Sequence, residues 1–261
     1  MDRDPDLRFC LLGAVRVRRG AVDLELGGRQ PRTILALLLA GAGTTVGLSE
    51  MVDTLWGDDP PVSAVNVVHR HIGVLRRVLE PELPVRATGD HLIRQASGYR
   101  LLVDEHNFDL LRFRRLAAEA RRTDDPAVAV RRYATALSLW HGRCAAELEM
   151  DHPSFLAVEA ERWQVTREAA DAAQRGGPVR MVLPALRQAA VLNPLDEGLQ
   201  ARLLLALASD GRQAEAMHTF REVRRRLVDE LGLGPGPQLV EAYDRLLVRT
   251  RPKVTCSSCG R

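Results

Sequence analysis

The sequence lacks the features of a membrane protein or a secreted protein. Its longest apolar run, residues 34–42, is too short to span a bilayer. The first residues, MDRDPD, have neither the basic start nor the apolar stretch of a signal peptide. These absences predict a cytoplasmic protein with no membrane partner.

Motifs of catalysis and of cofactor binding are missing as well. Neither the phosphate-binding GxxxxGKS/T nor GxSxG occurs, and the glycine pairs at 27 and 176 lack flanking motif residues. His69, His71 and His91 have no Cys, Asp or Glu partners at metal-ligand spacing. We therefore expect no enzymatic activity, no cofactor and no metal.

The few cysteines form neither a disulfide pattern nor a complete metal-binding motif. Four cysteines in a chain expected to be cytoplasmic do not suggest disulfides. Cys256 and Cys259 form a CxxC that would supply half of a zinc site, but no second CxxC or HxxxH completes four ligands. We interpret them as reduced thiols on a flexible tail, residues 251–261.

Lysine is nearly absent, and basic charge is distributed unevenly. Lys253 is the only lysine, so 36 of the 37 basic residues are arginine. Residues 1–108 hold 13 arginines and 14 acids, so bulk charge does not argue for nucleic acid. Residues 63–100, however, hold six arginines against three acids. Such a local basic face is what docking on phosphates requires.

The chain is long enough for two domains. Its 261 residues, 46% hydrophobic and 27% charged, are typical of a soluble globular protein. Residues 8–17 and 22–26 are β-rich and predict a small antiparallel sheet. Two helices follow, one from about Pro31 and one N-capped by Ser49. Their expected buried residues are Ile34, Leu35, Leu38 and Leu39 in the first helix and Met51, Val52 and Leu55 in the second.

A third predicted helix, residues 64–79, has one apolar stripe and one polar face. The stripe contains Val65, Val68, Ile72, Leu75 and Leu79. The outward face is expected to carry Asn66, His69, Arg70, Gly73, Arg76 and Arg77. Residues 91–95 and 99–103 then predict a β-hairpin, with Gly98 supplying the turn. A sheet, three helices and a terminal hairpin constitute a winged helix-turn-helix, whose third helix enters the major groove of DNA.

The candidate DNA-contacting residues are Asn66, His69, Arg70, His71, Arg76, Arg77 and Arg94. Asn can pair bidentately with adenine and Arg with guanine, whereas Arg76 and Arg77, later in the helix, are better placed to hold phosphates. Arg94 on the wing is a candidate for the minor groove or the DNA backbone. The alternatives are a solvated amphipathic helix and, for Arg94, a solvent-facing strand residue.

The turn between the second and third helices carries Asp58, Asp59, Pro60 and Pro61. Consecutive prolines force a turn there. Phosphate would repel two acids beside a DNA helix, so a protein partner with a basic surface is one hypothesis, and helix capping or turn chemistry is the other. Trp56, just before the turn, is interpreted as a core anchor rather than a partner-binding aromatic.

From Phe108 onward the sequence is helical in pattern. Helices are expected at about 109–122, 126–140, 153–174, 178–192, 195–209, 212–230 and 237–249. The pattern Ala-x3-Tyr/Phe-x2-Ala/Val occurs at 129/133/136 and 216/220/223, with a degenerate copy at 182/186/189. This repetition predicts tetratricopeptide-like helix pairs, with ordinary bundle packing as the alternative. The predicted fold is mainly α with a small β component, in two domains, 1–107 and 108–250.

Several stretches resemble the Streptomyces antibiotic regulatory protein (SARP) family of transcription activators. In the winged helix they are RQPRTILALLL, VGLSEMVDTLWGDDPP, VLRRVL and SGYRL. In the helical part they are FDLLRFRRLAAEAR, ALSLWHG, NPLDE and SDGRQAEAMHTFREVRRRLVDELGLGPGPQL. The resemblance spans about residues 7–250. LWGDDPP together with ELGLGPGPQL is highly specific, because neither is dictated by helix or turn physics.

The resemblance implies an OmpR-type winged helix followed by a bacterial transcriptional activation domain. Such proteins activate biosynthetic gene clusters and bind direct repeats in promoters as two molecules side by side. They recruit RNA polymerase through its sigma factor and the C-terminal domain of its alpha subunit. Residues 58–61 occupy the position that contacts polymerase in such regulators. No receiver or nucleotide-binding domain is appended, which implies the small, unphosphorylated class.

The sequence departs from the family pattern in two places. His69, His71 and Val74 replace residues usual in the third helix, so the base preference is not carried over. Gly176, Gly177 and Pro178 replace part of a helix in the middle repeat. A repressor with the same DNA contacts, and a repeat scaffold whose winged helix binds protein, are the alternative functions.

Overall fold

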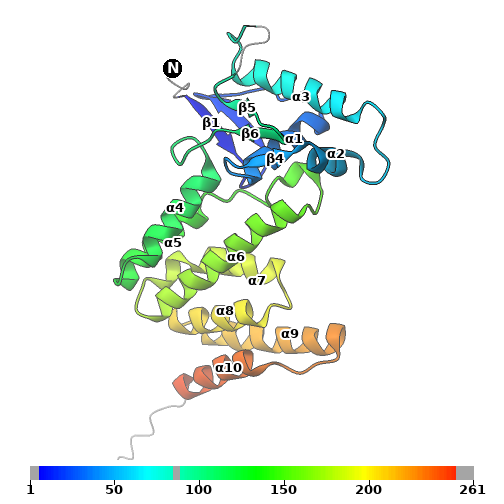
Figure 1. The fold of residues 1–261 in the computed structure, drawn as a ribbon. Coiled ribbons are helices and arrows are strands. Elements are labelled where there is room, and N and C mark those ends of the chain that lie inside the picture. The colour runs from blue at the N-terminus through cyan, green and yellow to red at the C-terminus, as the bar shows by residue number, and fades with distance from the viewer. Residues whose placement is uncertain (1–5, 85–88, 251–261) are drawn as a thin grey trace, which may run out of the picture. The chain divides into compact units, whose positions relative to one another are not determined.

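The structure is a computed structural model that describes residues 6–84 and 89–250. It contains two compact units, and Figure 1 shows their elements. The first unit contains the described residues up to 118 together with 135–162, and the second contains 119–134 together with the described residues from 163 onward. No described helix combines the length and apolar character needed to cross a membrane. The predicted tail with Cys256 and Cys259 lies outside the described residues.

The first unit opens with a three-stranded antiparallel sheet. Its strands are β1 (Leu7–Cys10), β2 (Arg16–Arg19) and β3 (Val22–Asp23), in that order across the sheet. Phe9 pairs with Val17, and both are buried. The alternation of side chains between the two faces of a strand explains why their chain neighbours Arg8 and Arg18 are exposed. The predicted small antiparallel sheet is confirmed, but residues 11–15, inside the first predicted segment, form a turn between β1 and β2.

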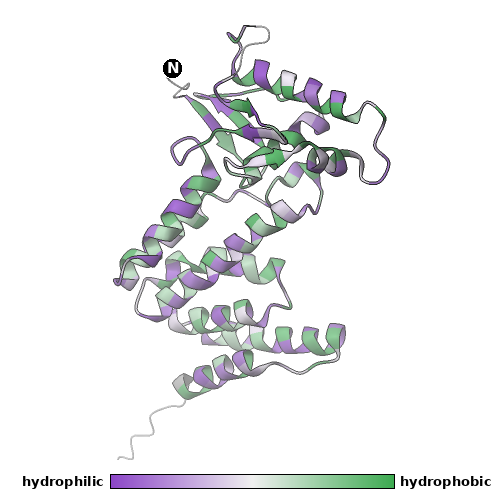
Figure 2. Cartoon of the chain, viewed as in Figure 1, coloured by the Kyte–Doolittle hydropathy of each residue, from purple (hydrophilic) through white to green (hydrophobic). Residues whose placement is uncertain are grey.

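Three helices follow the sheet: α1 (Arg29–Ala40), α2 (Leu48–Trp56) and α3 (Ala64–Leu79). α1 is buried continuously from Thr33 to Leu39, so it forms the centre of this unit, with α2 and α3 packed against it. All four residues predicted to be buried in α1 are buried. In Figure 2, hydrophilic and hydrophobic residues interleave along α3, as an amphipathic helix requires.

A second sheet completes the winged helix-turn-helix. It contains β4 (Thr45–Gly47), β5 (Leu92–Arg94) and β6 (Gly98–Leu101), in the order β4-β6-β5. The predicted hairpin is confirmed as β5 and β6, but Gly98 lies in the strand rather than the turn. A Cβ on Gly98 would lie 1.9 Å from the carbonyl oxygen of Val46, so glycine is required by the close approach of β4. β4 itself was not predicted.

Some local predictions for these helices are wrong. Ser49 does not cap α2, because the helix begins at Leu48 and Gly47 occupies the N-cap. Val65 is 45% exposed, and Ala64 takes its place in the apolar stripe because residue 64 is one helical turn before Val68. Val52, Leu55 and Trp56 are half-buried rather than core residues, and Met51 alone of the predicted α2 set is buried.

Segments after the hairpin are bonded into the first unit. α4 (Asp109–Arg121) begins with a carboxylate that accepts the backbone N–H groups of Leu11 at 3.0 Å and Leu12 at 3.1 Å. Glu147, in the short 3-10 helix η1 (Ala146–Leu148), accepts the N–H of Val15 at 2.8 Å. These carboxylates accept hydrogen bonds from backbone N–H groups in the turn between β1 and β2, which would be costly to bury without a partner. The first unit therefore includes chain well beyond the hairpin.

The second unit is helical. It contains the end of α4 from residue 119, α5 (Pro126–Leu137) up to residue 134 and α6 (Pro153–Gln174) from residue 163. It also contains η2 (Val179–Met181), α7 (Leu183–Leu192), α8 (Glu197–Ser209), α9 (Gln213–Leu231) and α10 (Pro237–Thr250). These bounds agree with the predicted helices to within two residues, except that the helix predicted at 126–140 ends at Leu137 and the helix predicted from 178 is η2 followed by α7. Gly177 packs against α5, since a Cβ there would lie 2.5 Å from Val130 Cγ2.

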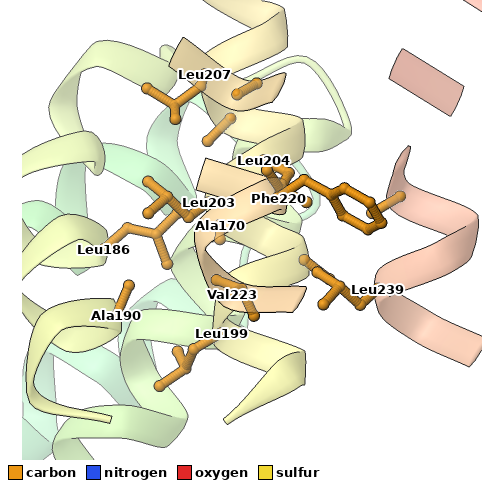
Figure 3. Packing of buried hydrophobic residues seen from close by; sticks show 14 of the residues in the cluster. Ala170, Leu186, Ala190, Leu199, Leu203, Leu204, Leu207, Phe220, Val223 and Leu239 are labelled. Carbon is orange, nitrogen blue, oxygen red and sulfur yellow. The ribbon is translucent and has the colours of Figure 1, made fainter. Parts of the chain in front are cut away.

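The core of this unit lies between consecutive helices. Figure 3 shows Leu186 of α7, Leu204 of α8, Phe220 of α9 and Leu239 of α10 converging on one cluster. Tyr243 of α10 stacks on Phe220, with ring centroids 3.9 Å apart. All nine positions of the repeated pattern are buried: Ala129, Tyr133, Ala136, Val182, Leu186, Ala189, Ala216, Phe220 and Val223. The repetition therefore marks buried positions in every second helix, α5, α7 and α9, with Val182 just before α7, as in tetratricopeptide-like pairs.

Candidate nucleic-acid interface

One face of α3 is open to solvent and carries donors. Asn66, Arg70 and Arg77 are exposed, and spacings of four and seven residues place them on one stripe of the helix. Among the described residues, no hydrogen bond or ion pair engages any of these three side chains. The opposite stripe, Ala64, Val68, Ile72, Leu75 and Leu79, is buried. The helix is therefore fixed by its apolar face and presents uncommitted amide and guanidinium groups on the other.

Arg76 does not project freely, contrary to expectation. Its Nε and Nη2 donate to the backbone carbonyl of Leu92 at 3.2 and 3.0 Å, and its guanidinium carbon lies 5.8 Å from the ring centroid of Tyr99. His69 contacts the same ring, edge to face, at a centroid distance of 6.1 Å. Arg76 and His69 thus join the flank of α3 to the hairpin.

His71 faces α1 rather than solvent. Its Nε2 lies 2.9 Å from Oε1 of Gln30, a hydrogen bond that a neutral ring donates. Burial lowers the pKa of His71, and the positive charge of Arg70 lowers it further. Both effects disfavour the charged form of the ring.

Arg94 ends β5 at the tip of the hairpin, and its side chain is exposed. Gln95, Ala96 and Ser97 form the turn beside it and are exposed too. The turn is closed by the N–H of Gln95, which donates to the carbonyl of Gly98 at 2.9 Å. Tyr99, buried behind the tip, was not among the predicted site residues. The aromatic within SGYRL was the available signal, because aromatic side chains in strands pack against their cross-strand neighbours.

The loop between α2 and α3 is exposed throughout residues 57–63. Backbone hydrogen bonds order its two ends: Gly57 N–H donates to Asp53 at 2.7 Å, and Ala64 N–H donates to Pro61 at 2.8 Å. No described residue donates a hydrogen bond to the carboxylate of Asp58 or of Asp59. Helix capping therefore does not account for these carboxylates.

Metal and reactive-thiol chemistry find no support in the described part of the chain. No cluster of three His, Cys, Asp or Glu residues there could hold a metal ion. Cys10 and Cys144 are free thiols, and burial raises the pKa of Cys10 to about 11. A thiol with so high a pKa is rarely ionised and is a poor nucleophile.

Comparison with known proteins decides the family. Residues 108–247, more than half of the chain, match the family model described as "Bacterial transcriptional activator domain". The regulatory protein DnrI of Streptomyces peucetius is 31% identical over 250 residues, which cover 92% of each chain. The chain belongs to the SARP family of transcriptional regulators. Regulators of this family act on DNA and on the transcription machinery.

Two further comparisons agree with this family assignment. It is 35% identical over 248 residues to the regulatory protein AfsR of Streptomyces coelicolor, but spans about a quarter of the length of that relative, 24%. The solved structure of EmbR from Mycobacterium tuberculosis, in complex with a low affinity phosphopeptide, matches with a TM-score of 0.77 and 25% identity. That match covers 94% of this chain and 66% of EmbR. The predicted SARP resemblance and the winged helix plus helical fold are confirmed.

Proposed function

We propose that this SARP-family protein is a sequence-specific activator of a biosynthetic gene cluster, which binds direct repeats in promoters and recruits RNA polymerase. The observation that carries the proposal is the exposed stripe of Asn66, Arg70 and Arg77. These side chains make no hydrogen bond or ion pair with a described residue, and the opposite face of their helix is buried in the core. Amide and guanidinium groups of this kind pair with base edges and phosphates in the major groove.

The groove-facing set is narrower than the sequence suggests. Asn66 and Arg70, in the first half of α3, are proposed to contact bases, and Arg77 and Arg94 are proposed to contact the DNA backbone on either side. His69 and Arg76 are proposed to support DNA binding indirectly, because they hold the hairpin against α3. His71 is proposed to do so through its hydrogen bond to α1. These three are positioning residues in this proposal.

The loop bearing Asp58, Asp59, Pro60 and Pro61 is proposed as the contact with polymerase. Its carboxylates are exposed and would be repelled by DNA, so a basic protein surface is the matching partner. The proposed partners are the sigma factor and the C-terminal domain of the alpha subunit, with two copies of the regulator side by side on the repeats. A contact worth ~1.4 kcal/mol raises polymerase occupancy about tenfold at an unsaturated promoter.

Gel shifts and footprinting on the DNA upstream of the neighbouring genes test this proposal. We expect a salt-dependent shift and protection of direct repeats near the −35 region. Protection between −10 and +1 would instead favour a repressor with the same DNA contacts. Failure to shift any upstream fragment would favour a repeat scaffold whose winged helix binds protein.

A further inference from the structure

Gly73 lies in the middle of the outward stripe of α3. It is seven residues after Asn66, three after Arg70 and four before Arg77, so helical geometry sets all four on one face. Its neighbours on this face, Arg70 and Arg77, have long side chains that donate hydrogen bonds. Gly73 carries no side chain, so the stripe has a gap at its centre.

Nothing within the protein explains a glycine at this position. Its φ angle is not among the positive values found at other glycines, so the backbone does not need the freedom of glycine. A Cβ built on Gly73 meets no atom within 4 Å, so packing does not need it either. Gly98 differs, because the strand β4 leaves no space for a Cβ there. Glycine inside a helix is also less favourable than alanine.

We infer that Gly73 leaves room for DNA, and that the edge of a base pair in the major groove approaches the backbone of α3 at this point. The inference rests on the proposed function. The major groove is about 12 Å wide and a helix with its side chains about as thick, so a side chain at the centre of the inserted face limits how deep the helix lies. Depth decides whether Asn66 and Arg70 reach base edges, whereas long arginines still reach phosphates from a shallower position.

Gly73→Ala separates this role from a structural one. We expect the variant to unfold at a higher temperature than the wild type, because alanine favours the helix. We expect its affinity for the footprinted promoter repeat to fall by about tenfold, the size expected when one base contact is removed, with nonspecific DNA bound as before. The dependence of log K on log salt should be unchanged, because no charge is removed. Gly73→Gln, a longer side chain with good helix propensity, should lose more affinity.

Gly234→Ala is the control outside α3, since Gly234 also has open space around a built Cβ and no positive φ, and it lies in the loop before α10. It should bind the promoter repeat as the wild type does. Promoter affinity of Gly73→Ala equal to or tighter than that of the wild type would overturn the inference. An equal loss on promoter and nonspecific DNA would overturn it too, because base edges would not be involved. A wild-type protein that binds no DNA would overturn the proposed function itself, and this inference with it.

Discussion

The guanidinium of Arg76 donates two hydrogen bonds to the backbone carbonyl of Leu92, from Nε at 3.2 Å and from Nη2 at 3.0 Å. This contact fastens α3 to β5, the first strand of the hairpin. Arg77, the next residue, is exposed, and its side chain makes no hydrogen bond or ion pair with a described residue. Two adjacent arginines of the same helix therefore differ: Arg76 is hydrogen-bonded within the protein, and Arg77 is the one proposed to contact DNA.

Arg76→Ala is expected to destabilise the protein, and Arg77→Ala is not. Loss of a charged donor to a half-buried carbonyl costs ~1–2 kcal/mol of unfolding free energy, measured by urea denaturation. Arg77→Ala should leave that free energy within ~0.5 kcal/mol of the wild type while weakening DNA binding at every sequence. Equal unfolding free energies for the two variants would contradict the structural role of Arg76.

Gly98→Ala should disrupt the junction of β4 with the hairpin. Its Cβ would lie 1.9 Å from Val46 O and 2.9 Å from the Cα of Gly47, and neither backbone atom can rotate away. Overpacking of this kind costs ~1–3 kcal/mol or more. Gly47→Ala, directly opposite in the sheet, is the control, because its Cβ would lie 3.7 Å from its nearest neighbour, Ser49 Oγ. We expect thermal denaturation to show a lower Tm for Gly98→Ala than for Gly47→Ala, and the reverse order would refute this.

Asp109 should make stability depend on pH. Burial raises the pKa of Asp109 from 3.8 to about 6, although hydrogen bonds from Leu11, Leu12 and Leu110 oppose the shift. Between those two values the folded state holds the proton and the unfolded state does not. The contribution of Asp109 is therefore full below pH 4 and declines by ~3 kcal/mol as pH rises through 6.

Urea denaturation of the wild type and Asp109→Asn at several pH values checks this. Asparagine keeps an acceptor for the N–H groups of Leu11 and Leu12 but does not titrate. The difference in unfolding free energy between the two proteins should shift in favour of the variant from pH 4 to pH 7. A difference that stays constant across this range would show that Asp109 has an ordinary pKa.

Asp58→Asn/Asp59→Asn should separate DNA binding from activation. Both carboxylates are exposed and engage no described side-chain donor, so their loss leaves the fold and α3 unchanged. We expect wild-type promoter affinity and a several-fold loss of transcript in a purified system with RNA polymerase holoenzyme. Glu25→Gln, another exposed acid, pairs with Arg32 and serves as the charge control, expected to transcribe normally. Unimpaired transcription by the loop variant would exclude residues 58–61 as a polymerase contact.

Local periodicity accounts for what the sequence could predict. The helix at residues 64–79 has the predicted bounds, because alternating spacings of three and four are visible without any tertiary information. Which of its polar residues are free was not predictable. Arg76 meets a carbonyl sixteen residues away, and His71 meets Gln30 of another helix. Partners brought together only by the fold leave no mark on the helical pattern.

Short elements escaped prediction for a related reason. β4 has only three residues, and it is a strand because β6 lies beside it. The requirement for glycine at position 98 comes from the same approach, whereas the sequence alone favoured a turn. Asp109 satisfies backbone groups nearly a hundred residues earlier, a relationship that no local pattern encodes.

The central claim is that the exposed face of α3 binds DNA, and its most direct test is the salt dependence of promoter binding for the wild type and Arg70→Ala/Arg77→Ala. Fluorescence anisotropy with labelled promoter DNA at several salt concentrations gives the slope of log K against log salt for each protein. If both arginines contact phosphates or bases, affinity falls at least tenfold, and the slope becomes shallower by about 0.9 for each phosphate that the variant no longer neutralises. Wild-type affinity together with a wild-type slope in the double variant would contradict the account.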